Sequence, residues 1–358
     1  MNLADLRREI DSLDEQIVTF INQRYKLVAE VGKWKNTNAH EIYVPEREKA
    51  LLTRLEGLND GPLPNSTLRA IYREIMSGAL ALEYPLAIAY LGPENTFSNQ
   101  AALAKFGKSV QYRPKNSIAE VFEDVEKQKV SYGVVPIENS TEGAVTYTLD
   151  MFVQSGCRIC AEINLPAHQC LMSQSKPEDI RVIYSHPQAI AQCRGYLHRN
   201  FPNVSILEVR STAEAARRAA VEPDSAAIAS QLAAEYYEIN ILEEKIEDMM
   251  NNVTRFLVIG SQEPKQTGDD KTSIIFGVKD KIGALYECLS HFDKDEISLT
   301  MIESRPTKNK DGEYYFFVDF KGHIEEELTK ALIENLKKVC IFVKVLGSYP
   351  NSSLKSDS

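Results

Sequence analysis

Cysteine and long apolar runs are both scarce in this sequence of 358 residues. Six cysteines are too few to cross-link so long a chain, so its folding must depend on hydrophobic cores rather than on a disulfide framework. No apolar run approaches the roughly 20 residues that a membrane-spanning helix needs. The charged start, MNLADLRREIDSLDEQ, is unlike a signal peptide. These absences predict a cytoplasmic protein without a membrane partner.

Positive charge and phosphate-binding glycine motifs are also lacking. The chain has 41 Lys and Arg residues against 51 Asp and Glu residues, which gives a formal net charge of -10. Such a chain is a poor partner for nucleic acid, because the phosphates repel it. Neither GxGxxG nor a GxxxxGKS or GxxxxGKT motif occurs, which argues against a bound dinucleotide or ATP. We therefore expect no cofactor and no nucleic-acid partner.

One group of cysteines raises the question of zinc. Cys157 and Cys160 form a CxxC, with His168 and Cys170 downstream. Structural zinc sites usually need two paired ligand clusters at characteristic spacing, whereas the segment CRICAEINLPAHQCLM has the pattern of β-structure. These cysteines are therefore expected to pack in a core, with no metal.

The length predicts two or three domains, and the first of them, residues 1–84, has helical periodicity. Apolar residues recur at steps of three and four through a first helix of some thirty residues. A second helix is expected after Pro45 and a third in STLRAIYREIMSGALALE. Three helices this elongated bury little surface alone, so we expect an all-helical domain that forms an intertwined homodimer or a higher oligomer.

From residue 86 the pattern changes to short strands that alternate with helices. Over residues 86–262 this alternation predicts a two-lobed α/β domain with mainly parallel sheets and a cleft between the lobes. Two of its helices begin with capping boxes, Ser117 to Glu120 and Ser211 to Glu214. After the polar linker QEPKQTGDDK, residues 272–350 follow the order βαββαβ, which is the ferredoxin-like arrangement.

Cations lie among the apolar positions of the first two helices. Arg7 and Arg24 are 17 residues apart, or about 26 Å along a helix, so one small ligand cannot touch both in one chain. In an antiparallel dimer, Arg7 of one chain would approach Arg24 of the other. The alternative is that they are solvated charges on a helix face. Arg24 and Lys35 are embedded in apolar periodicity, which favours an anion site.

Hydroxyl and amide side chains cluster at strand ends of the middle region. Thr254 and Arg255 stand in NNVTRF, just where the buried strand FLVIG begins. A polar pair at a strand edge would be the ordinary interpretation, but further polar groups come from ENST, which is expected at a strand-to-helix junction, and from two other helix starts. Helix N-termini attract anions through their free N–H groups and dipole. The residues expected to line an anion-binding cleft with Thr254 are Thr96, Ser98, Asn139, Ser140, Thr141, Ser211 and Thr212.

These motifs carry a resemblance along the chain from about residue 3 to residue 350. LRREIDSLDEQIV, INQRYKLVAEVGKWK and VPEREK resemble the all-helical chorismate mutase domain. YLGPENTFS, GVVPIENSTEGAV, SHPQA and NNVTRF together resemble prephenate dehydratase, and GALYECL with ESRP is similar to the ACT regulatory module. The order matches the bifunctional chorismate mutase–prephenate dehydratase family of phenylalanine biosynthesis.

The resemblance implies a role for each cation of the helical domain. Arg7 from the partner chain and Arg24 would bind the two carboxylates of chorismate. Lys35 would hold the ether oxygen and a carboxylate, Arg47 would be a supporting charge, and Glu48 would bind the ring hydroxyl. The reaction, a rearrangement to prephenate, needs no protein nucleophile and no cofactor.

The sequence departs from the family pattern at four positions. Val44 stands where an aspartate is frequent, and Ala79 replaces a serine, so one hydrogen bond is absent. Glu83 occupies the place of a glutamine that faces the ether oxygen, where it would have to be protonated in order to donate a hydrogen bond. Asn95 replaces the glycine common in GPEGTF, which puts the backbone shape of that loop in question.

In the dehydratase region the resemblance makes Thr254 the catalytic residue, which donates a hydrogen bond to the hydroxyl leaving prephenate. Arg255 would either compensate a substrate carboxylate or order the entry of the strand, and the sequence leaves both alternatives open. His186 is expected to be a structural hydrogen-bonding residue, and Cys193 a packing residue rather than a nucleophile.

The resemblance implies that phenylalanine is an allosteric inhibitor that acts through the last region. It also implies that phenylpyruvate is the final product of the dehydratase. The implied effector-binding residues are Gly283, Ala284, Leu285, Glu303, Ser304 and Arg305. Two rival interpretations remain: a non-catalytic amino-acid sensor, and a monofunctional dehydratase with a decayed mutase domain, which Val44 and Ala79 keep open.

Overall fold

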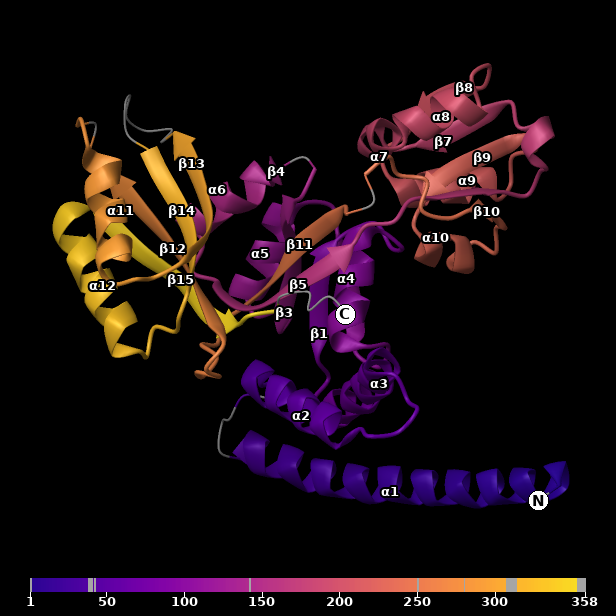
Figure 1. The fold of residues 1–358 in the computed structure, drawn as a ribbon, viewed down its shortest axis with the longest axis horizontal. Coiled ribbons are helices and arrows are strands. Elements are labelled where there is room, and N and C mark those ends of the chain that lie inside the picture. The colour runs from indigo at the N-terminus through magenta and orange to yellow at the C-terminus, as the bar shows by residue number, and fades with distance from the viewer. Residues whose placement is uncertain are drawn as a thin grey trace. The chain divides into compact units, whose positions relative to one another are not determined.

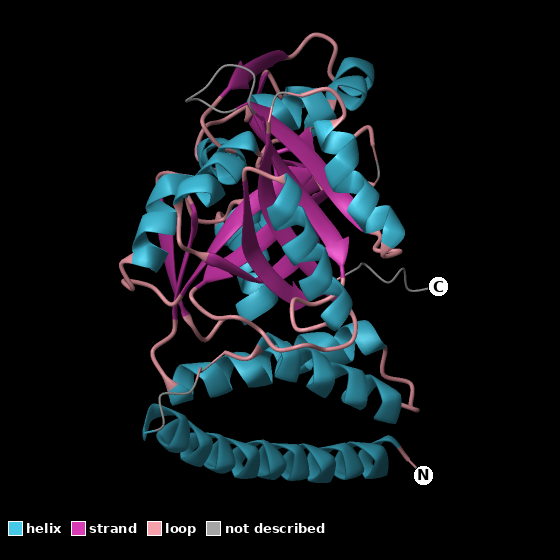
Figure 2. Cartoon of the chain, turned by 90° about the vertical axis from the view of Figure 1, so that its left-hand side faces the viewer, coloured by secondary structure: helices cyan, strands magenta, loops and turns pink. Residues whose placement is uncertain are grey.

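The computed structural model describes residues 2–37, 41, 43–141, 143–249, 251–279, 281–306 and 314–352. It divides into two compact units, of which the first comprises residues 1–87 and 105–111, and the second residues 88–104 and 112–358. Figure 1 labels the elements, and the secondary-structure colours of Figure 2 show that the first unit is built from helices while the second carries the sheets. No helix in the described part of the chain is both long and apolar enough to cross a membrane.

Three helices form most of the first unit: α1 (Leu3–Thr37), α2 (Pro45–Leu58) and α3 (Asn65–Glu83). The prediction of an unusually long first helix is confirmed, because α1 has 35 residues. The second half of α1 packs on α3, where the Tyr25 hydroxyl donates to the Ile75 carbonyl at 3.0 Å. At Gly32 a Cβ atom would lie 3.1 Å from Cα of Glu83, so the two helices approach closely there.

The first half of α1 leaves its apolar side chains exposed within a single chain. This stripe has the periodicity of a buried helix face, yet each member is 45% to 64% exposed: Leu3, Leu6, Ile10, Leu13, Ile17 and Phe20. An apolar stripe this regular normally faces another helix, because water is an unfavourable neighbour for it. The stripe is one of the features discussed below under the proposed function.

The first sheet of the second unit has the order β2-β1-β3-β11-β5, with β4 paired to β3. Its strands are β1 (Ala87–Leu91), β2 (Gln111–Lys115), β3 (Tyr132–Asn139), β4 (Gly143–Ala144), β5 (Arg158–Pro166) and β11 (Val253–Gly260). The helices of this lobe are α4 (Phe97–Phe106), α5 (Ile118–Glu126) and α6 (Thr146–Gln154).

The second sheet has the order β10-β6-β9-β7-β8. Its strands are β6 (Cys170–Ser173), β7 (Val182–Ser185), β8 (Ser205–Glu208), β9 (Ser225–Ala229) and β10 (Ile241–Glu243). The helices of this lobe are the short 3-10 helix η1 (Pro177–Asp179), α7 (Pro187–Gln192), α8 (Arg194–Asn200), α9 (Thr212–Ala219) and α10 (Gln231–Tyr236). Small residues of α9 pack on β9 in the core of this lobe.

The prediction of mainly parallel sheets is wrong. β1 pairs with β3 in parallel, and β7 pairs in parallel with both β8 and β9. However, β11 is antiparallel to both β3 and β5, and β6 is antiparallel to β9 and β10. The reason is topological, since β11 re-enters the first sheet after the whole second lobe and inserts between two strands already formed.

The last region forms a four-stranded antiparallel sheet of order β13-β14-β12-β15. Its elements, in chain order, are β12 (Asp270–Val278), α11 (Ala284–Lys294), β13 (Leu299–Pro306), β14 (Tyr314–Lys321), α12 (Glu327–Val339) and β15 (Phe342–Pro350). The predicted order βαββαβ is therefore confirmed. Its core lies between the sheet and the two helices, where Phe276, Phe292 and Phe320 are buried.

The cysteines in question are packing residues in the described structure. Cys157, Cys160, Cys170 and Cys193 are all buried at no more than 4% exposure. Burial raises the pKa of the Cys193 thiol, and Glu247 and Asp248 raise it further. A thiol held protonated in this way is a poor nucleophile.

Candidate active sites

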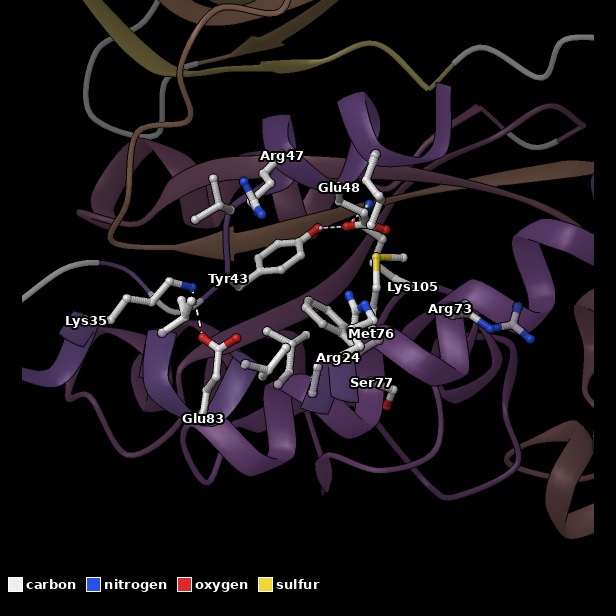
Figure 3. A pocket seen from close by; sticks show the side chains of 17 residues that line it. Arg24, Lys35, Tyr43, Arg47, Glu48, Arg73, Met76, Ser77, Glu83 and Lys105 are labelled. Carbon is white, nitrogen blue, oxygen red and sulfur yellow. Dashed lines mark hydrogen bonds and ion pairs between the residues drawn. The ribbon is translucent and has the colours of Figure 1, made fainter. Parts of the chain in front are cut away.

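A cavity of about 350 Å³ lies in the first unit, and we call it the N-terminal pocket. Arg24, Val28, Val31 and Lys35 of α1 face it at steps of four, three and four residues, which places them on one helix face. Its other walls come from the two residues before α2, from α2 and α3, and from the end of α4 (Figure 3): Tyr43, Val44, Arg47, Glu48, Leu51, Arg73, Met76, Ser77, Ala79, Leu80, Glu83, Lys105 and Phe106.

The charge of this pocket suits an anion. Among the described residues that line it, five carry a guanidinium or an ammonium group and two carry a carboxylate. The Nη1 nitrogen of Arg24 is buried and has no hydrogen-bond partner within the described structure. A buried charged donor without a partner is costly, and because Arg24 also lines the cavity, an anionic ligand there would supply the missing acceptor.

Lys35 and Glu83 form an ion pair at the end of α1, with Nζ 2.9 Å from Oε2. Both side chains are mostly buried, at 15% and 9% exposure. The close approach of α1 to α3 at Gly32, one turn earlier, is what brings these two side chains together. In Figure 3 this pair lies on one side of Tyr43, and Glu48 lies on the other.

The remaining residues expected in this site divide into two groups. Arg24, Lys35, Arg47, Glu48 and Glu83 all line the N-terminal pocket. Arg7 is exposed on the first half of α1 and does not line the pocket of its own chain, as its separation from Arg24 predicts. Val44 and Ala79 also line it, so the two departures from the family pattern face the cavity itself.

A second cavity of about 330 Å³ lies in the second unit and is lined by both lobes; we call it the interlobe pocket. It contains Thr96, Ser98, Asn139, Ser211, Thr212 and Thr254, which the sequence predicts to share a cleft. Further lining residues were not predicted, among them Gln169, Gln188, Gln192, Arg210 and Asn252. Arg210 directly precedes the capping box that begins at Ser211, and this position next to a predicted helix start could have identified it as a lining residue.

The hydroxyl of Thr254 is oriented by its neighbours. Asn139 Nδ2 donates to Thr254 Oγ1 at 2.8 Å. The amide of Asn139 is itself fixed, because the backbone N–H and the hydroxyl of Thr141 both donate to its Oδ1. Since the oxygen of Thr254 accepts from Asn139, its own proton remains available to donate into the pocket.

The sequence suggested that Ser140 and Thr141 stand at a helix N-terminus, but the structure does not place them there. β4 follows them, and α6 begins only at Thr146. Ser140 Oγ instead donates to the Asn251 carbonyl and accepts from the Val253 N–H, which joins this turn to the start of β11. These two residues lie outside the lining of the interlobe pocket and act on the segments that position Asn139 and Thr254.

The start of α9 brings N–H groups and a cation to the same pocket. Ser211 caps the helix by accepting from the Glu214 N–H at 3.1 Å, so the predicted capping box is present. Arg210 is exposed at this helix start and lines the interlobe pocket. His186 caps α7 through a hydrogen bond from the Gln188 N–H at 3.3 Å, the kind of structural bond that was predicted, and it also lines the interlobe pocket.

Asn95 adopts a positive φ of 65°, the backbone conformation that the glycine of the family motif would favour. Asparagine tolerates this conformation better than most residues do. Its N–H donates to Asn99 Oδ1 at 3.0 Å, which fixes the turn that leads into α4. The replacement of glycine therefore leaves the shape of the loop intact.

Arg255 points away from the interlobe pocket. Side chains alternate along a strand, so β11 presents Thr254 to the pocket and Arg255 to the opposite face. There its guanidinium contacts Glu162 at 2.8 Å, Asp319 at 2.6 Å and the Tyr349 hydroxyl at 2.9 Å. This location fits the second interpretation, in which Arg255 orders the strand, and does not fit a substrate carboxylate in the pocket.

The arginine belongs to a buried ion cluster that joins the first lobe to the C-terminal sheet. We use the name Arg255 cluster for Arg255, Glu162, Lys271, Asp319 and Tyr349. Burial would raise the pKa of Glu162, but Arg255 and Lys271 outweigh it and hold that pKa below its ordinary value. Burial would lower the pKa of Arg255, but the nearby Tyr349, Asp319 and Glu162 outweigh burial and raise that pKa above its ordinary value.

The implied effector residues lie on two elements of the C-terminal region. Gly283 has a φ of 80° just before α11, while Ala284 and Leu285 pack against the core of that region. Glu303, Ser304 and Arg305 lie on the edge strand β13. The guanidinium of Arg305 makes two hydrogen bonds of 3.1 Å to Asp150 on α6, so this side chain is already paired in the described structure.

Comparison with known proteins covers nearly the whole chain. Residues 6–84 match the family model for chorismate mutase type II, and residues 88–264 match the one for prephenate dehydratase. The chain is 47% identical, over 99% of both chains, to a bifunctional chorismate mutase/prephenate dehydratase of Aquifex aeolicus (strain VF5). It is also 47% identical, over 98% of both chains, to the protein of the same name from Stutzerimonas stutzeri.

A solved structure supports the same assignment for the second unit. The prephenate dehydratase of Arthrobacter aurescens in complex with L-Phe is 32% identical and has a TM-score of 0.69. The match covers 74% of this chain and 90% of that chain. The family matches and these relatives place both the helical and the α/β segments in one enzyme, and the chain belongs to the family of bifunctional chorismate mutase/prephenate dehydratases.

Proposed function

We propose that residues 1–84 form the chorismate mutase domain, residues 86–262 the prephenate dehydratase domain and residues 272–350 an ACT regulatory domain. The enzyme would rearrange chorismate to prephenate in the N-terminal pocket and convert prephenate to phenylpyruvate in the interlobe pocket. The cationic excess of the first and the hydroxyl- and amide-rich lining of the second support this division.

The unpartnered Nη1 of Arg24 is the observation that carries the assignment of the N-terminal pocket. A carboxylate of chorismate would satisfy that donor, with Arg47 close to the same cavity. Lys35 would hold the ether oxygen and a carboxylate, because its ammonium lines the cavity beside Glu83. Rearrangement needs no nucleophile, so the rate would come from a compact bound conformer and from charge stabilisation at the breaking bond.

A second chain would complete this pocket. The exposed stripe on the first half of α1 would be covered by the antiparallel α1 of a partner, which would carry its Arg7 toward Arg24. The test mixes two inactive proteins, Arg7→Ala and Arg24→Ala, under conditions of subunit exchange. Mixed dimers contain one pocket with both arginines, so part of the mutase activity should return. If mixed dimers form and no activity returns, the shared pocket is wrong.

In the interlobe pocket, Thr254 would act as the hydrogen-bond donor to the leaving hydroxyl of prephenate. The hydrogen bond from Asn139 leaves the threonine proton directed away from Asn139, which is what such a donor requires. Aromatisation drives the loss of carbon dioxide and hydroxide, so the protein has to supply only modest acid assistance. Arg210 and the N-terminus of α9 would compensate a substrate carboxylate.

The C-terminal region would bind phenylalanine and inhibit the dehydratase. Its βαββαβ order supports an ACT module, and the relative from Arthrobacter aurescens has been solved with L-Phe. The bond of Arg305 to Asp150 and the Arg255 cluster both connect this region to the catalytic lobe. These connections supply a physical route by which an effector on β13 would act on the strand that carries Thr254.

A further inference from the structure

The N-terminal pocket has one wall that lies outside the chorismate mutase segment. The family match for the mutase ends at residue 84, yet Lys105 and Phe106, the last two residues of α4, line the pocket. They belong to the segment matched to prephenate dehydratase. By their contacts, however, residues 105–111 form part of the first compact unit.

The segment that carries Lys105 is fixed to α3 by three features. The Lys108 N–H donates to Glu74 Oε2 at 2.9 Å, and the Ser109 N–H donates to Ser77 Oγ at 2.9 Å. Between them and the helix, Gly107 adopts a φ of 70°, and a Cβ atom there would lie 2.5 Å from Cβ of Ser77. A close approach that only glycine permits indicates a built contact, so the position of Lys105 in the pocket is defined by its own chain.

Lys105 and Tyr43 converge on one oxygen of Glu48. The ammonium of Lys105 lies 3.2 Å from Glu48 Oε2, and the Tyr43 hydroxyl donates to the same oxygen at 2.9 Å (Figure 3). Within the described structure no other donor contacts Glu48, so Oε1 is left to accept from a ligand. The side chains of Lys105 and Glu48 are 21% and 17% exposed, so solvent screens this contact only in part.

Tyr43 is itself positioned by Lys105 and Phe106. Tyr43 is 3% exposed, and its ring lies 5.1 Å from the Phe106 ring, centroid to centroid. The Lys105 ammonium lies 5.8 Å from the centre of the Tyr43 ring. Lys105 therefore acts on Glu48 directly through its charge and indirectly through the tyrosine that donates to the same carboxylate oxygen.

We propose that Lys105 is a positioning residue for the mutase reaction. Its ammonium holds the Glu48 carboxylate in the orientation in which it accepts a hydrogen bond from the ring hydroxyl of chorismate. This proposal rests on the proposed role of Glu48. It means that the mutase pocket is completed by a residue of the dehydratase segment, so the two activities of the chain share a structural element. Glu48 would contact the hydroxyl both before and during rearrangement, so losing its orientation should weaken binding more than turnover.

The test uses the full-length chain with Lys105→Met, which removes the ammonium and keeps much of the side-chain volume. The mutase KM for chorismate should rise about tenfold, the effect expected from losing a charge-assisted hydrogen bond, while kcat changes less than about threefold. A variant that merely misfolded would lower the apparent kcat and leave KM unchanged. Lys105→Arg, which keeps the charge, should restore most of the affinity.

Two controls isolate the contact. Lys108→Met removes an exposed lysine three residues further along, and its mutase KM should match the wild type. In a Glu48→Gln background, adding Lys105→Met should have little further effect, because its target carboxylate is absent. An unchanged KM in Lys105→Met, or an equally large effect in the Glu48→Gln background, would overturn the proposal. Wild-type mutase kinetics in Glu48→Gln alone would instead overturn the assigned role of Glu48.

Discussion

Replacing Arg255 by methionine should destabilise the second unit while leaving prephenate affinity intact. The change removes the cation that faces Glu162 and Asp319, whose side chains are 0% and 6% exposed. Removing one partner of a buried ion pair costs about 3–5 kcal/mol, because the remaining charge is left uncompensated. With a urea m-value of about 3 kcal/mol/M, the upper end of the range for small proteins, that cost corresponds to a midpoint lowered by about 1 to 2 M.

The assay follows dehydratase activity against urea concentration for the second unit. Trp34, the only tryptophan, lies on α1, so its fluorescence reports the first unit and should shift less. Arg181→Met, which removes an exposed arginine of the second lobe, is the matched control and should leave the midpoint unchanged. Arg255→Lys keeps the charge but not the three-way contact, so an intermediate midpoint is expected.

Two outcomes would refute the reasoning. An unshifted midpoint in Arg255→Met would mean that the cluster adds nothing to stability. A raised KM for prephenate, measured well below the unfolding midpoint and without a loss of stability, would support the rejected interpretation in which Arg255 binds a substrate carboxylate.

Three further predictions concern catalysis, titration and regulation. Glu83→Gln should raise mutase kcat, because an amide replaces the carboxylate that forms the ion pair with Lys35 and can donate a hydrogen bond to the ether oxygen; an unaltered mutase kcat would remove Glu83 from the mechanism. Because the pKa of Glu162 is lowered in the folded protein, the stability that its carboxylate contributes is fully present above the ordinary glutamate pKa of about 4.3. That stability is lost as the pH falls through the lower pKa of the folded state. The gap in urea midpoint between wild type and Glu162→Gln should therefore be constant from pH 7 to 5 and close at lower pH; a gap that already closes between pH 7 and 5 would contradict the depressed pKa. Gly283→Val, which forces a branched residue to a φ of 80°, should reduce inhibition of the dehydratase by L-phenylalanine. The control Gly268→Val, at a φ of 89° outside the effector motif, should not reduce it. Equal inhibition of both variants by L-phenylalanine would place the effector site elsewhere.

The sequence predicted most elements and many residues of both pockets, and the exceptions have physical causes. Period-2 alternation along β11 places Thr254 and Arg255 on opposite faces, yet the role of Arg255 stayed open at the level of the sequence, because its partners on β14 and β15 lie 64 and 94 residues away and leave no local signal. Ser140 and Thr141 were placed at a helix start because the two-residue strand β4 is too short to predict.

Lys105 shows a different limit of sequence analysis. It has ordinary helical surroundings in FSNQAALAKF, and nothing in that pattern connects it with Glu48, 57 residues earlier. Only the backbone contacts of residues 107–109 with α3 bring it into the N-terminal pocket. A residue that serves one domain from the sequence of another becomes visible only when the chain is folded.

The most direct test of the central claim, that one chain carries two separate active sites, compares Thr254→Ala with Arg24→Ala. Each purified protein is incubated first with chorismate and then with prephenate, and the substrates and phenylpyruvate are followed by ultraviolet absorbance. Thr254→Ala should consume chorismate and accumulate prephenate, Arg24→Ala should convert only prephenate, and a mixture of the two should form phenylpyruvate from chorismate. Loss of both activities in either correctly folded single variant would contradict the two-site account.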